Sequence, residues 1–311
     1  MERWSLVIVG AGPAGLTSGI YGARSGLDTL ILEEALPGGL TAKSPWIENY
    51  PGFPEGISGA DLIERMLKQC ERFGVEVKSF EGVKRLLVDG EVKRVETEKG
   101  AYSAKAVIIA SGCRHRTLGV PGEERLRGMG VSYCAICDGP FFKGKRVLVV
   151  GGGNTAATSA VYLSKIASEV LLVHRREELR AERIYLDEIK RRGIKVLWNT
   201  EVREIKGDEK VEGVKLYNNK TGEVAEEEVD GVFIAVGETP NSEFARDAGV
   251  KVDREGYIIT DNLQRTNMPG VYAAGDVTSC PVKQVGTAVG QAIVAALEAY
   301  GYVERPYYYR G

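Results

Sequence analysis

The chain has 311 residues, which is enough for two ordinary domains with separate apolar cores. It is 43% hydrophobic and 27% charged, as expected of a globular protein, and its net charge of −2 gives no general attraction to nucleic acid or to anionic membranes. No apolar run approaches the roughly 18 residues of a membrane span, and no signal peptide is recognisable, so we expect a cytoplasmic protein with neither nucleic acid nor membrane as partner.

The first predicted element is a βαβ unit. A strand over 5–9 runs into the loop Gly10-Ala-Gly12-Pro13-Ala14-Gly15, then a helix, then a strand over 29–32 that is followed by Glu33. Glycines at this spacing permit a tight turn and bring a pyrophosphate close to the helix N-terminus. An acid after the second strand accepts hydrogen bonds from a ribose diol and disfavours a 2′-phosphate, so this site suits FAD or NAD.

The next segments predict packing elements. Residues 60–73 carry apolar side chains at helical spacing, and Cys70 lies on this stripe, so we expect it to pack in the core. Segments 83–88 and 92–97, separated by Asp89-Gly90, predict a hairpin. An apolar strand over 107–112 then ends at a glycine.

The segment Cys134-Ala-Ile-Cys137-Asp138 carries redox chemistry. A Cys-x-x-Cys pair stores two electrons as a disulfide, and a helix start favours its thiolate. Asp138 is the nearest acid in sequence and is the candidate proton donor. The remaining cysteines are scattered, and His115 and His174 are remote from the pair, so we expect neither a disulfide scaffold nor a metal site.

A second βαβ unit repeats the first. A strand over 146–150 leads into Gly151-Gly-Gly153-Asn154-Thr155-Ala156, a helix, and a strand over 170–173 followed by His174-Arg175-Arg176 and by Arg180. Cations stand here where the first unit has Glu33, and arginine supplies the bidentate donors that a 2′-phosphate requires, so NADPH is favoured over NADH. A solvated basic surface is the alternative, because Glu177, Glu178 and Glu182 are interleaved.

The remaining segments complete the two domains. Strands over 202–205 and 213–217 predict a three-stranded insert, and the strand over 232–237 resembles that over 107–112. The tail holds Gly275-Asp276 and a helix over 286–300 but has no glycine fingerprint, so it completes the first domain, and residues 307–309 form a surface tail. The predicted fold class is α/β with two three-layer, Rossmann-like dinucleotide-binding domains. The FAD domain comprises residues 1–114 and 241–311, and the inserted NADPH domain comprises residues 115–240.

These motifs together closely resemble the low-molecular-weight thioredoxin reductases over nearly the whole chain. Further segments that carry the resemblance are 48–53, 130–139 and 273–277. The resemblance implies a homodimer in which electrons pass from NADPH through FAD and the Cys134–Cys137 pair to the disulfide of thioredoxin or a glutaredoxin-like protein. It also implies that Cys137 faces the flavin, Cys134 attacks the partner, Asp138 donates the proton, and the inserted domain rotates on crossovers near Arg114 and Asn241.

Motifs and resemblance together assign the cofactor contacts. The residues expected to contact FAD are Gly10, Gly12, Pro13, Ala14, Gly15, Glu33, Glu34, Gly39, Leu40, Asn49, Val83, Ala110, Gly112, Gly275, Asp276, Lys283, Gln284, Val285 and Ala288. The residues expected to contact NADPH are Gly151, Gly153, Asn154, Thr155, Ala156, His174, Arg175, Arg176, Arg180 and Gly237. Leu40, Lys283 and Thr158-Ser159 depart from the residues that many relatives have.

Two alternatives stay open at this point. A related flavoprotein dithiol reductase would take its electrons from NADH or reduced ferredoxin. A redox sensor would bind nucleotide without turnover.

Overall fold

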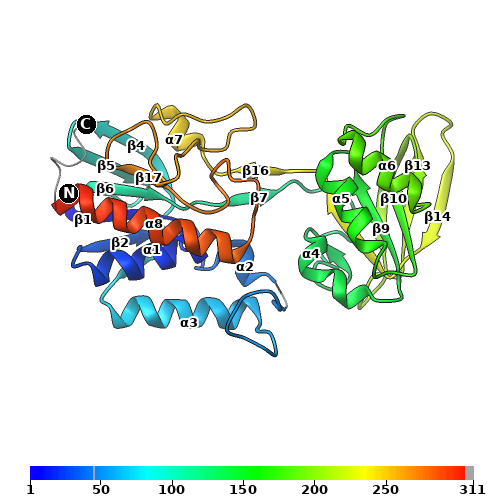
Figure 1. Ribbon diagram of the computed structural model, residues 1–311, viewed down its shortest axis with the longest axis horizontal. Helices are drawn as coiled ribbons and strands as arrows, with labels where there is room; N and C mark the ends of the chain where they lie inside the picture. Colours follow the sequence, from blue (N-terminus) through cyan, green and yellow to red (C-terminus); the bar gives the residue numbers. More distant parts are fainter. Residues whose placement is uncertain (45, 305–311) are drawn as a thin grey trace. The chain divides into compact units, whose positions relative to one another are not determined.

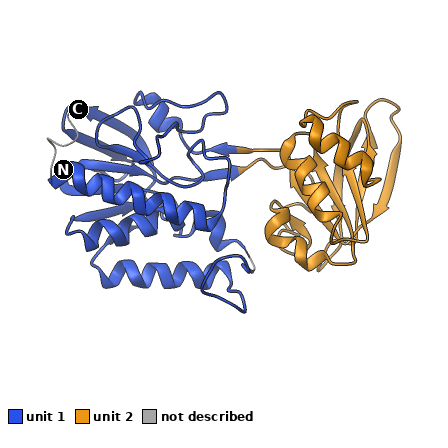
Figure 2. Ribbon diagram, viewed as in Figure 1, with its two compact units in different colours: residues 1–114, 239–311 blue, residues 115–238 orange. Residues whose placement is uncertain are grey.

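The computed structural model describes residues 1–44 and 46–304, and the chain divides into two compact units. Unit 1 is formed by residues 1–114 together with the chain from residue 239 onward, and unit 2 by residues 115–238 (Figure 2). These boundaries lie where the crossovers near Arg114 and Asn241 are predicted. Residues 307–309, the expected surface tail, lie outside the described residues.

A mixed sheet forms the centre of unit 1 (Figure 1), with the order β3-β2-β1-β6-β5-β4 and with β17 also paired to β6. Its strands are β1 (Glu2–Val9), β2 (Thr29–Leu32), β3 (Glu76–Lys78), β4 (Val83–Asp89), β5 (Val92–Thr97), β6 (Ala101–Ile109) and β17 (Val271–Ala273). Residues 101–104 of β6 pair antiparallel with β5, while residues 107–109 pair parallel with β17. The C-terminal segment therefore completes the sheet that the N-terminal segment begins, as predicted.

Helices α1, α3 and α8 cover one face of the sheet of unit 1. The helices of unit 1 are α1 (Pro13–Arg24), α2 (Gly39–Ala42), α3 (Gly59–Arg72), α7 (Glu243–Asp247) and α8 (Val285–Glu304). One core cluster joins the sheet to α1, α3 and α8, and the alanines on the buried side of α8 allow close packing. A second cluster lies on the other face and includes residues of α7 and of the β4–β5 hairpin.

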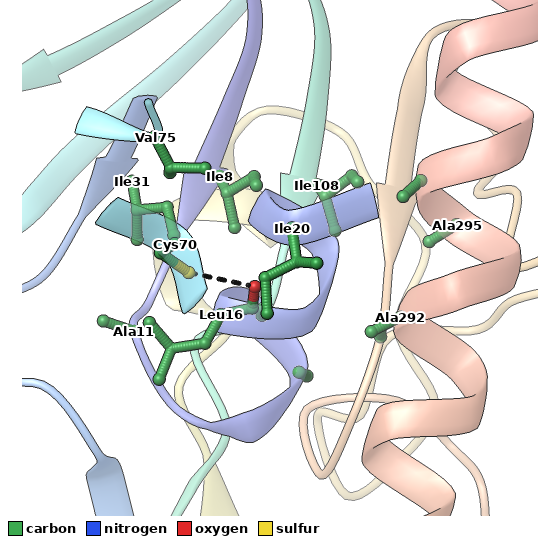
Figure 3. Packing of buried hydrophobic residues seen from close by; sticks show 14 of the residues in the cluster. Ile8, Ala11, Leu16, Ile20, Ile31, Cys70, Val75, Ile108, Ala292 and Ala295 are labelled. Carbon is green, nitrogen blue, oxygen red and sulfur yellow. Dashed lines mark hydrogen bonds between the residues drawn. The ribbon is translucent and has the colours of Figure 1, made fainter. Parts of the chain in front are cut away.

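Cys70 lies in the first core cluster, as its place on the helical stripe predicts. It is fully buried, and its Sγ donates a hydrogen bond to the Leu16 carbonyl oxygen at 3.3 Å (Figure 3). Burial raises the pKa of its thiol to about 12. The packing role predicted for Cys70 is therefore confirmed.

Unit 2 has its own parallel sheet, with the order β11-β10-β9-β15-β8. The strands are β8 (Val131–Ser132), β9 (Arg146–Gly151), β10 (Glu169–Val173), β11 (Lys195–Leu197) and β15 (Gly231–Ala235). One core cluster joins this sheet to α4 (Ala135–Asp138), α5 (Asn154–Leu163) and α6 (Arg183–Arg191), with a 3-10 turn over Gly139–Phe142. The other cluster joins it to the antiparallel sheet β12 (Thr200–Lys206), β13 (Gly213–Asn218) and β14 (Val224–Glu228), which confirms the predicted insert.

The two units use the same local arrangement. β1 lies between β2 and β6, and β9 lies between β10 and β15, with all of these pairs parallel. Each central strand runs directly into a glycine loop and a helix, so both loops lie at the carboxyl edge of their sheets, where α/β folds bind ligands. The crossover strands β7 (Cys113–His115) and β16 (Glu238–Pro240) pair with each other.

Within residues 1–44 and 46–304, no helix combines the length and the apolar character that a membrane span needs.

Candidate active site

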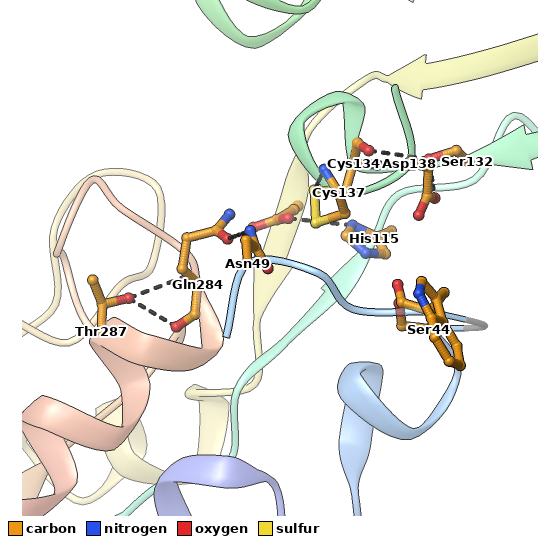
Figure 4. The surroundings of a disulfide bond; sticks show 11 residues. Ser44, Asn49, His115, Ser132, Cys134, Cys137, Asp138, Gln284 and Thr287 are labelled. Carbon is orange, nitrogen blue, oxygen red and sulfur yellow. Dashed lines mark hydrogen bonds and ion pairs between the residues drawn. A yellow bond between two sulfur atoms is a disulfide. The ribbon is translucent and has the colours of Figure 1, made fainter. Parts of the chain in front are cut away.

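Cys134 and Cys137 form a disulfide at the start of α4, with their Cα atoms 5.3 Å apart (Figure 4). Both residues are half-buried. Cys134 is the N-cap residue of α4, and its Sγ accepts a hydrogen bond from the backbone N–H of Cys137 at 3.2 Å. An N–H aimed at this sulfur stabilises negative charge on it, so the geometry favours a thiolate on Cys134 once the disulfide is reduced.

Asp138 ends the same turn and is held by Ser132. The Ser132 hydroxyl donates to Asp138 Oδ2 at 2.6 Å and accepts from the backbone N–H of Cys134 at 3.0 Å (Figure 4). Asp138 Oδ1 is buried without a hydrogen-bond partner among the described residues. Burial raises the pKa of Asp138 above its ordinary value, and the Ser132 hydrogen bond partly opposes this. The carboxyl next to the dithiol therefore holds its proton more readily than a solvated aspartic acid does.

The first glycine loop forms a cradle at the N-terminus of α1. A Cβ on Gly10, which has φ +102°, would lie 2.4 Å from the Ala110 carbonyl oxygen, and one on Gly15 would lie 1.8 Å from the Gly10 oxygen. Gly12 differs, because a Cβ there would meet no described atom within 4 Å. Gly10 and Gly15 are thus required for packing, while Gly12 borders open space at the helix N-terminus, as a bound pyrophosphate needs.

Some of the other predicted FAD positions lie beside this cradle. A Cβ on Gly39 would lie 3.9 Å from Gly12 Cα, and one on Gly275 would lie 2.9 Å from Ala14 Cβ and 3.6 Å from Ala288 Cβ. Five further positions are located by their elements: Pro13 is the first residue of α1, Leu40 lies in α2, Gly112 follows β6, Val83 begins β4 and Val285 begins α8. The Asn49 side-chain amide donates a hydrogen bond to Gln284 Oε1 at 3.0 Å (Figure 4). The exposed Glu34 carboxylate lies 4.0 Å from Lys84 Nζ.

Glu33 is fixed by backbone donors. Its Oε2 accepts from the N–H of Ala11 at 2.7 Å and its Oε1 from the N–H of Ala35 at 3.0 Å. An ionised carboxylate has further lone pairs, so Glu33 can accept from a ribose diol while it stays oriented. The open N-terminus of α1 together with this oriented acid fits an FAD-type dinucleotide.

Lys283, a predicted FAD contact, bonds a turn of unit 1. Its ammonium donates to the carbonyl oxygens of Asp276 at 2.9 Å and Thr278 at 2.6 Å, and lies 4.2 Å from the centre of the Tyr257 ring. It therefore holds the turn that carries Asp276. Sequence reasoning missed Gln291, whose Oε1 accepts from the Gly275 N–H at 2.7 Å, although its position one helical turn after Ala288 places it on the same face.

The second glycine loop repeats the cradle. A Cβ on Gly151 would lie 2.3 Å from the Ala235 oxygen, whereas one on Gly153, the N-cap of α5, would meet no described atom within 4 Å. Asn154 donates to Glu182 Oε1 at 2.7 Å and accepts from the Glu182 N–H at 2.8 Å. This pair joins the start of α5 to that of α6. Ala156 is buried, and Thr155 is exposed beside the open space.

The arginine cluster predicted to bind a 2′-phosphate is exposed. Within the described part of the chain, no acid forms an ion pair with Arg175, Arg176 or Arg180. The interleaved acids have other partners, since Glu177 pairs with Lys220 and Glu182 bonds Asn154. The arrangement leaves these cations available for an anion, and both the 2′-phosphate site and the alternative of a solvated basic surface stay open.

His174, a predicted NADPH contact, lies beneath the second glycine loop. It is 6% exposed, and a Cβ on Gly152 would lie 2.1 Å from its ring. Burial lowers the pKa of His174, the neighbouring arginines lower it further, and a backbone hydrogen bond at Glu178 opposes the shift. The ring packs under Gly152. Gly237, also predicted at this site, lies at the crossover, where its carbonyl accepts from the Arg116 N–H at 3.0 Å.

The fold and these sites define a flavin- and nicotinamide-dependent disulfide oxidoreductase, and comparison with known proteins agrees. The chain belongs to the pyridine nucleotide-disulphide oxidoreductase family, whose model matches residues 4–292.

The individual relatives that the chain resembles include thioredoxin reductases of several bacteria. The chain is 44% identical to a thioredoxin reductase of Listeria monocytogenes over 97% of this chain and 94% of that protein. It is 42% identical to one of Bacillus subtilis over 97% of this chain and 95% of that protein. The crystal structure of thioredoxin reductase from Streptococcus pyogenes superposes with a TM-score of 0.92 at 43% identity, covering 97% of this chain and 98% of that chain.

These comparisons confirm two predictions from the sequence. They confirm the resemblance to the low-molecular-weight thioredoxin reductases and the α/β fold with two dinucleotide-binding domains. Family membership implies FAD and NADPH as cofactors, and the two open glycine cradles fit them. The individual cofactor contacts and the assignment of each cofactor to its domain stay predictions.

Proposed function

We propose that this chain is an FAD-dependent enzyme that uses NADPH to reduce the disulfide of thioredoxin. The observation that carries the proposal is the Cys134–Cys137 disulfide, capped by a backbone N–H and placed beside a buried acid, in a chain with two nucleotide cradles. The names of relatives at 42–44% identity over 97% of the chain support thioredoxin as the partner.

The geometry supports one assignment of the two cofactors to the two cradles. FAD would be held at the N-terminus of α1 by the loop around Gly12 and by Glu33, and NADPH at the N-terminus of α5 by the loop around Gly153 and the arginine cluster. When bound, the flavin supplies the two-electron exchange between the nicotinamide and the disulfide.

The residues of this chain perform the thiol chemistry. Two electrons and two protons convert the disulfide to the thiols of Cys134 and Cys137. Cys134 loses its proton, its thiolate attacks one sulfur of the partner disulfide, and that S–S bond breaks. The leaving partner thiolate takes a proton from Asp138, which the Cys134 proton replaces. Cys137 then loses its proton and attacks Cys134 Sγ, which restores the internal disulfide; the second partner sulfur takes the Cys137 proton, and the partner leaves as a dithiol. The hydrogen bond from the Cys137 N–H supports the choice of Cys134 as first nucleophile.

Three finer points belong to the same proposal. A glutaredoxin-like protein is a second possible disulfide substrate, and light scattering on the purified protein tests the proposed homodimer. Cell fractionation tests the proposed cytoplasmic location, a reducing compartment in which a close cysteine pair is more often catalytic than structural.

The proposal is tested by half-reactions of the purified, FAD-loaded protein. Anaerobic NADPH should bleach the flavin absorbance, and thioredoxin should then oxidise NADPH catalytically. Cys137→Ser should keep flavin reduction and lose thioredoxin reduction, while Cys70→Ser serves as the matched control because Cys70 packs in the core. Undiminished thioredoxin turnover in Cys137→Ser would refute the dithiol relay. Flavin reduction by ferredoxin but not by NADPH would refute the donor.

A further inference from the structure

The segment 174–176, which carries two residues of the arginine cluster, is fixed by hydrogen bonds to each of its three backbone carbonyl oxygens. The His174 oxygen accepts from the Thr200 N–H at 2.9 Å, and the Arg176 oxygen from the Asn199 N–H at 3.1 Å. Between them, the Arg175 oxygen accepts from the side-chain amide of Asn219 at 2.9 Å. The middle hydrogen bond is thus made by a side chain, from the turn between β13 and β14.

That turn is ordered independently of any ligand. The Asn218 side-chain oxygen accepts from the N–H groups of Lys220 and Thr221, both at 3.0 Å. The Asn219 N–H donates to the Asn199 oxygen at 2.7 Å, and the Asn219 amide also donates to Glu201 at 3.2 Å. Asn219 is therefore fixed in place before nucleotide arrives, which lowers the ordering cost of the cluster.

Lys220 acts on the charge of the same segment. Its Nζ pairs with the carboxylate of Glu177, the acid that directly follows the Arg175-Arg176 pair. The pKa of Glu177 is lowered by this contact, so the acid is ionised. Without Lys220, that carboxylate would repel a dianionic phosphate and compete for the arginines. Lys220 and Glu177 are both largely exposed, so the pair contributes little to stability and mainly changes the local charge.

We propose that Asn219 and Lys220 are positioning residues that set the preference for a nicotinamide nucleotide with a 2′-phosphate over one without. Asn219 acts by orienting Arg175, and Lys220 acts by neutralising Glu177. The inference deepens the proposed function, because it rests on nucleotide binding at the arginine cluster. Neither residue is assigned a contact with the nucleotide itself.

The experiment measures dissociation constants of NADP⁺ and NAD⁺ on the FAD-loaded protein by calorimetry. Asn219→Ala should raise the Kd for NADP⁺ about three- to tenfold, which is the effect expected when the hydrogen bond to the Arg175 oxygen is lost. It should leave the Kd for NAD⁺ nearly unchanged. Lys220→Met should raise the Kd for NADP⁺ by a similar factor that shrinks at high salt. Lys220→Arg should retain the wild-type ratio.

A double variant isolates the mechanism. If Lys220 acts through Glu177, then Glu177→Gln combined with Lys220→Met should restore most of the NADP⁺ affinity. Lys206→Met is the matched control, because Lys206 forms an exposed ion pair with Glu226 at the end of β12 away from Asn218, and it should leave both constants unchanged.

The outcomes separate this inference from the proposed function. An unchanged ratio of the two constants in both Asn219→Ala and Lys220→Met would overturn it. Equal weakening of NADP⁺ and NAD⁺, with a lower melting temperature, would also overturn it, because that pattern reports collapse of the segment. If the wild-type protein binds neither nucleotide, the proposed function itself fails, and the wild-type measurement alone reveals this.

Discussion

Replacement of Gly12 by alanine should separate cofactor binding from folding. Gly12 has φ −75° and ψ −174°, which alanine adopts without strain, and a Cβ there meets no described atom within 4 Å. The added methyl group would instead enter the space at the N-terminus of α1 where a pyrophosphate approaches. Gly15→Ala is the contrasting change, because its Cβ would lie 1.8 Å from the Gly10 oxygen and the fold itself must shift.

The magnitudes follow from these contacts. A hydrogen bond from a backbone N–H to a charged oxygen contributes about 1.5–3 kcal/mol, so loss of one or two such bonds weakens FAD binding by about 3 kcal/mol. That loss raises the Kd for FAD about 100-fold. The FAD-free Gly12→Ala protein should be as stable as wild type or more stable by about 0.4–1 kcal/mol. Gly15→Ala should lose about 1–3 kcal/mol even without FAD.

The assay combines flavin content with thermal unfolding. Wild type, Gly12→Ala and Gly15→Ala are stripped of flavin, unfolded alone and with added FAD, and titrated with FAD. Gly153→Ala is the matched control in unit 2, because its Cβ also meets no described atom within 4 Å, and it should retain FAD but lose NADPH affinity. A Gly12→Ala protein that binds FAD with wild-type affinity would refute the assignment of this space to the cofactor.

Three further changes test other parts of the structure. Asp138→Asn should reduce thioredoxin turnover by about 100-fold or more while NADPH still reduces the flavin, because the amide supplies no acidic proton; equal loss in both half-reactions would contradict the role. The same change should also stabilise the protein at neutral pH. Burial raises the pKa of Asp138 in the folded state, so the stability that its protonated form contributes is lost as pH rises through that pKa, whereas the amide does not titrate. Lys93 is fully buried and its pKa is lowered by burial to about 8, so its charge destabilises the fold at pH 7. Between about pH 7 and pH 9, wild type should gain about 1 kcal/mol relative to Lys93→Met in chemical denaturation, and a constant difference would show that Lys93 does not titrate there. Gly152→Ala should destabilise by about 1–3 kcal/mol in thermal unfolding, because its Cβ would meet the His174 ring at 2.1 Å, and an unchanged melting temperature would contradict that packing.

Local patterns in the sequence determined the redox pair, both glycine loops and most elements. The helical stripe containing Cys70 and the hairpin at Asp89-Gly90 are formed as predicted, as α3 and as β4 with β5. These signals are readable because side-chain spacing and turn chemistry act over a few residues. The similarity between the two βαβ units is likewise visible from the spacing of residues within each repeat.

The tertiary structure alone decided which partner each polar side chain meets. Spacing after β10 placed His174 and Arg175 in one predicted ligand set, yet the structure buries His174 beneath Gly152 and leaves Arg175 exposed. Lys283 bonds the carbonyls of the Asp276 turn, and Asn219 reaches back to the Arg175 oxygen. Such contacts join segments far apart in the chain, and side-chain direction depends on the packing of both segments, so no local pattern contains them. The sequence by itself therefore determined the chemistry of this protein and the residues of its redox pair, while only the tertiary structure decided which side chains hold those residues in place.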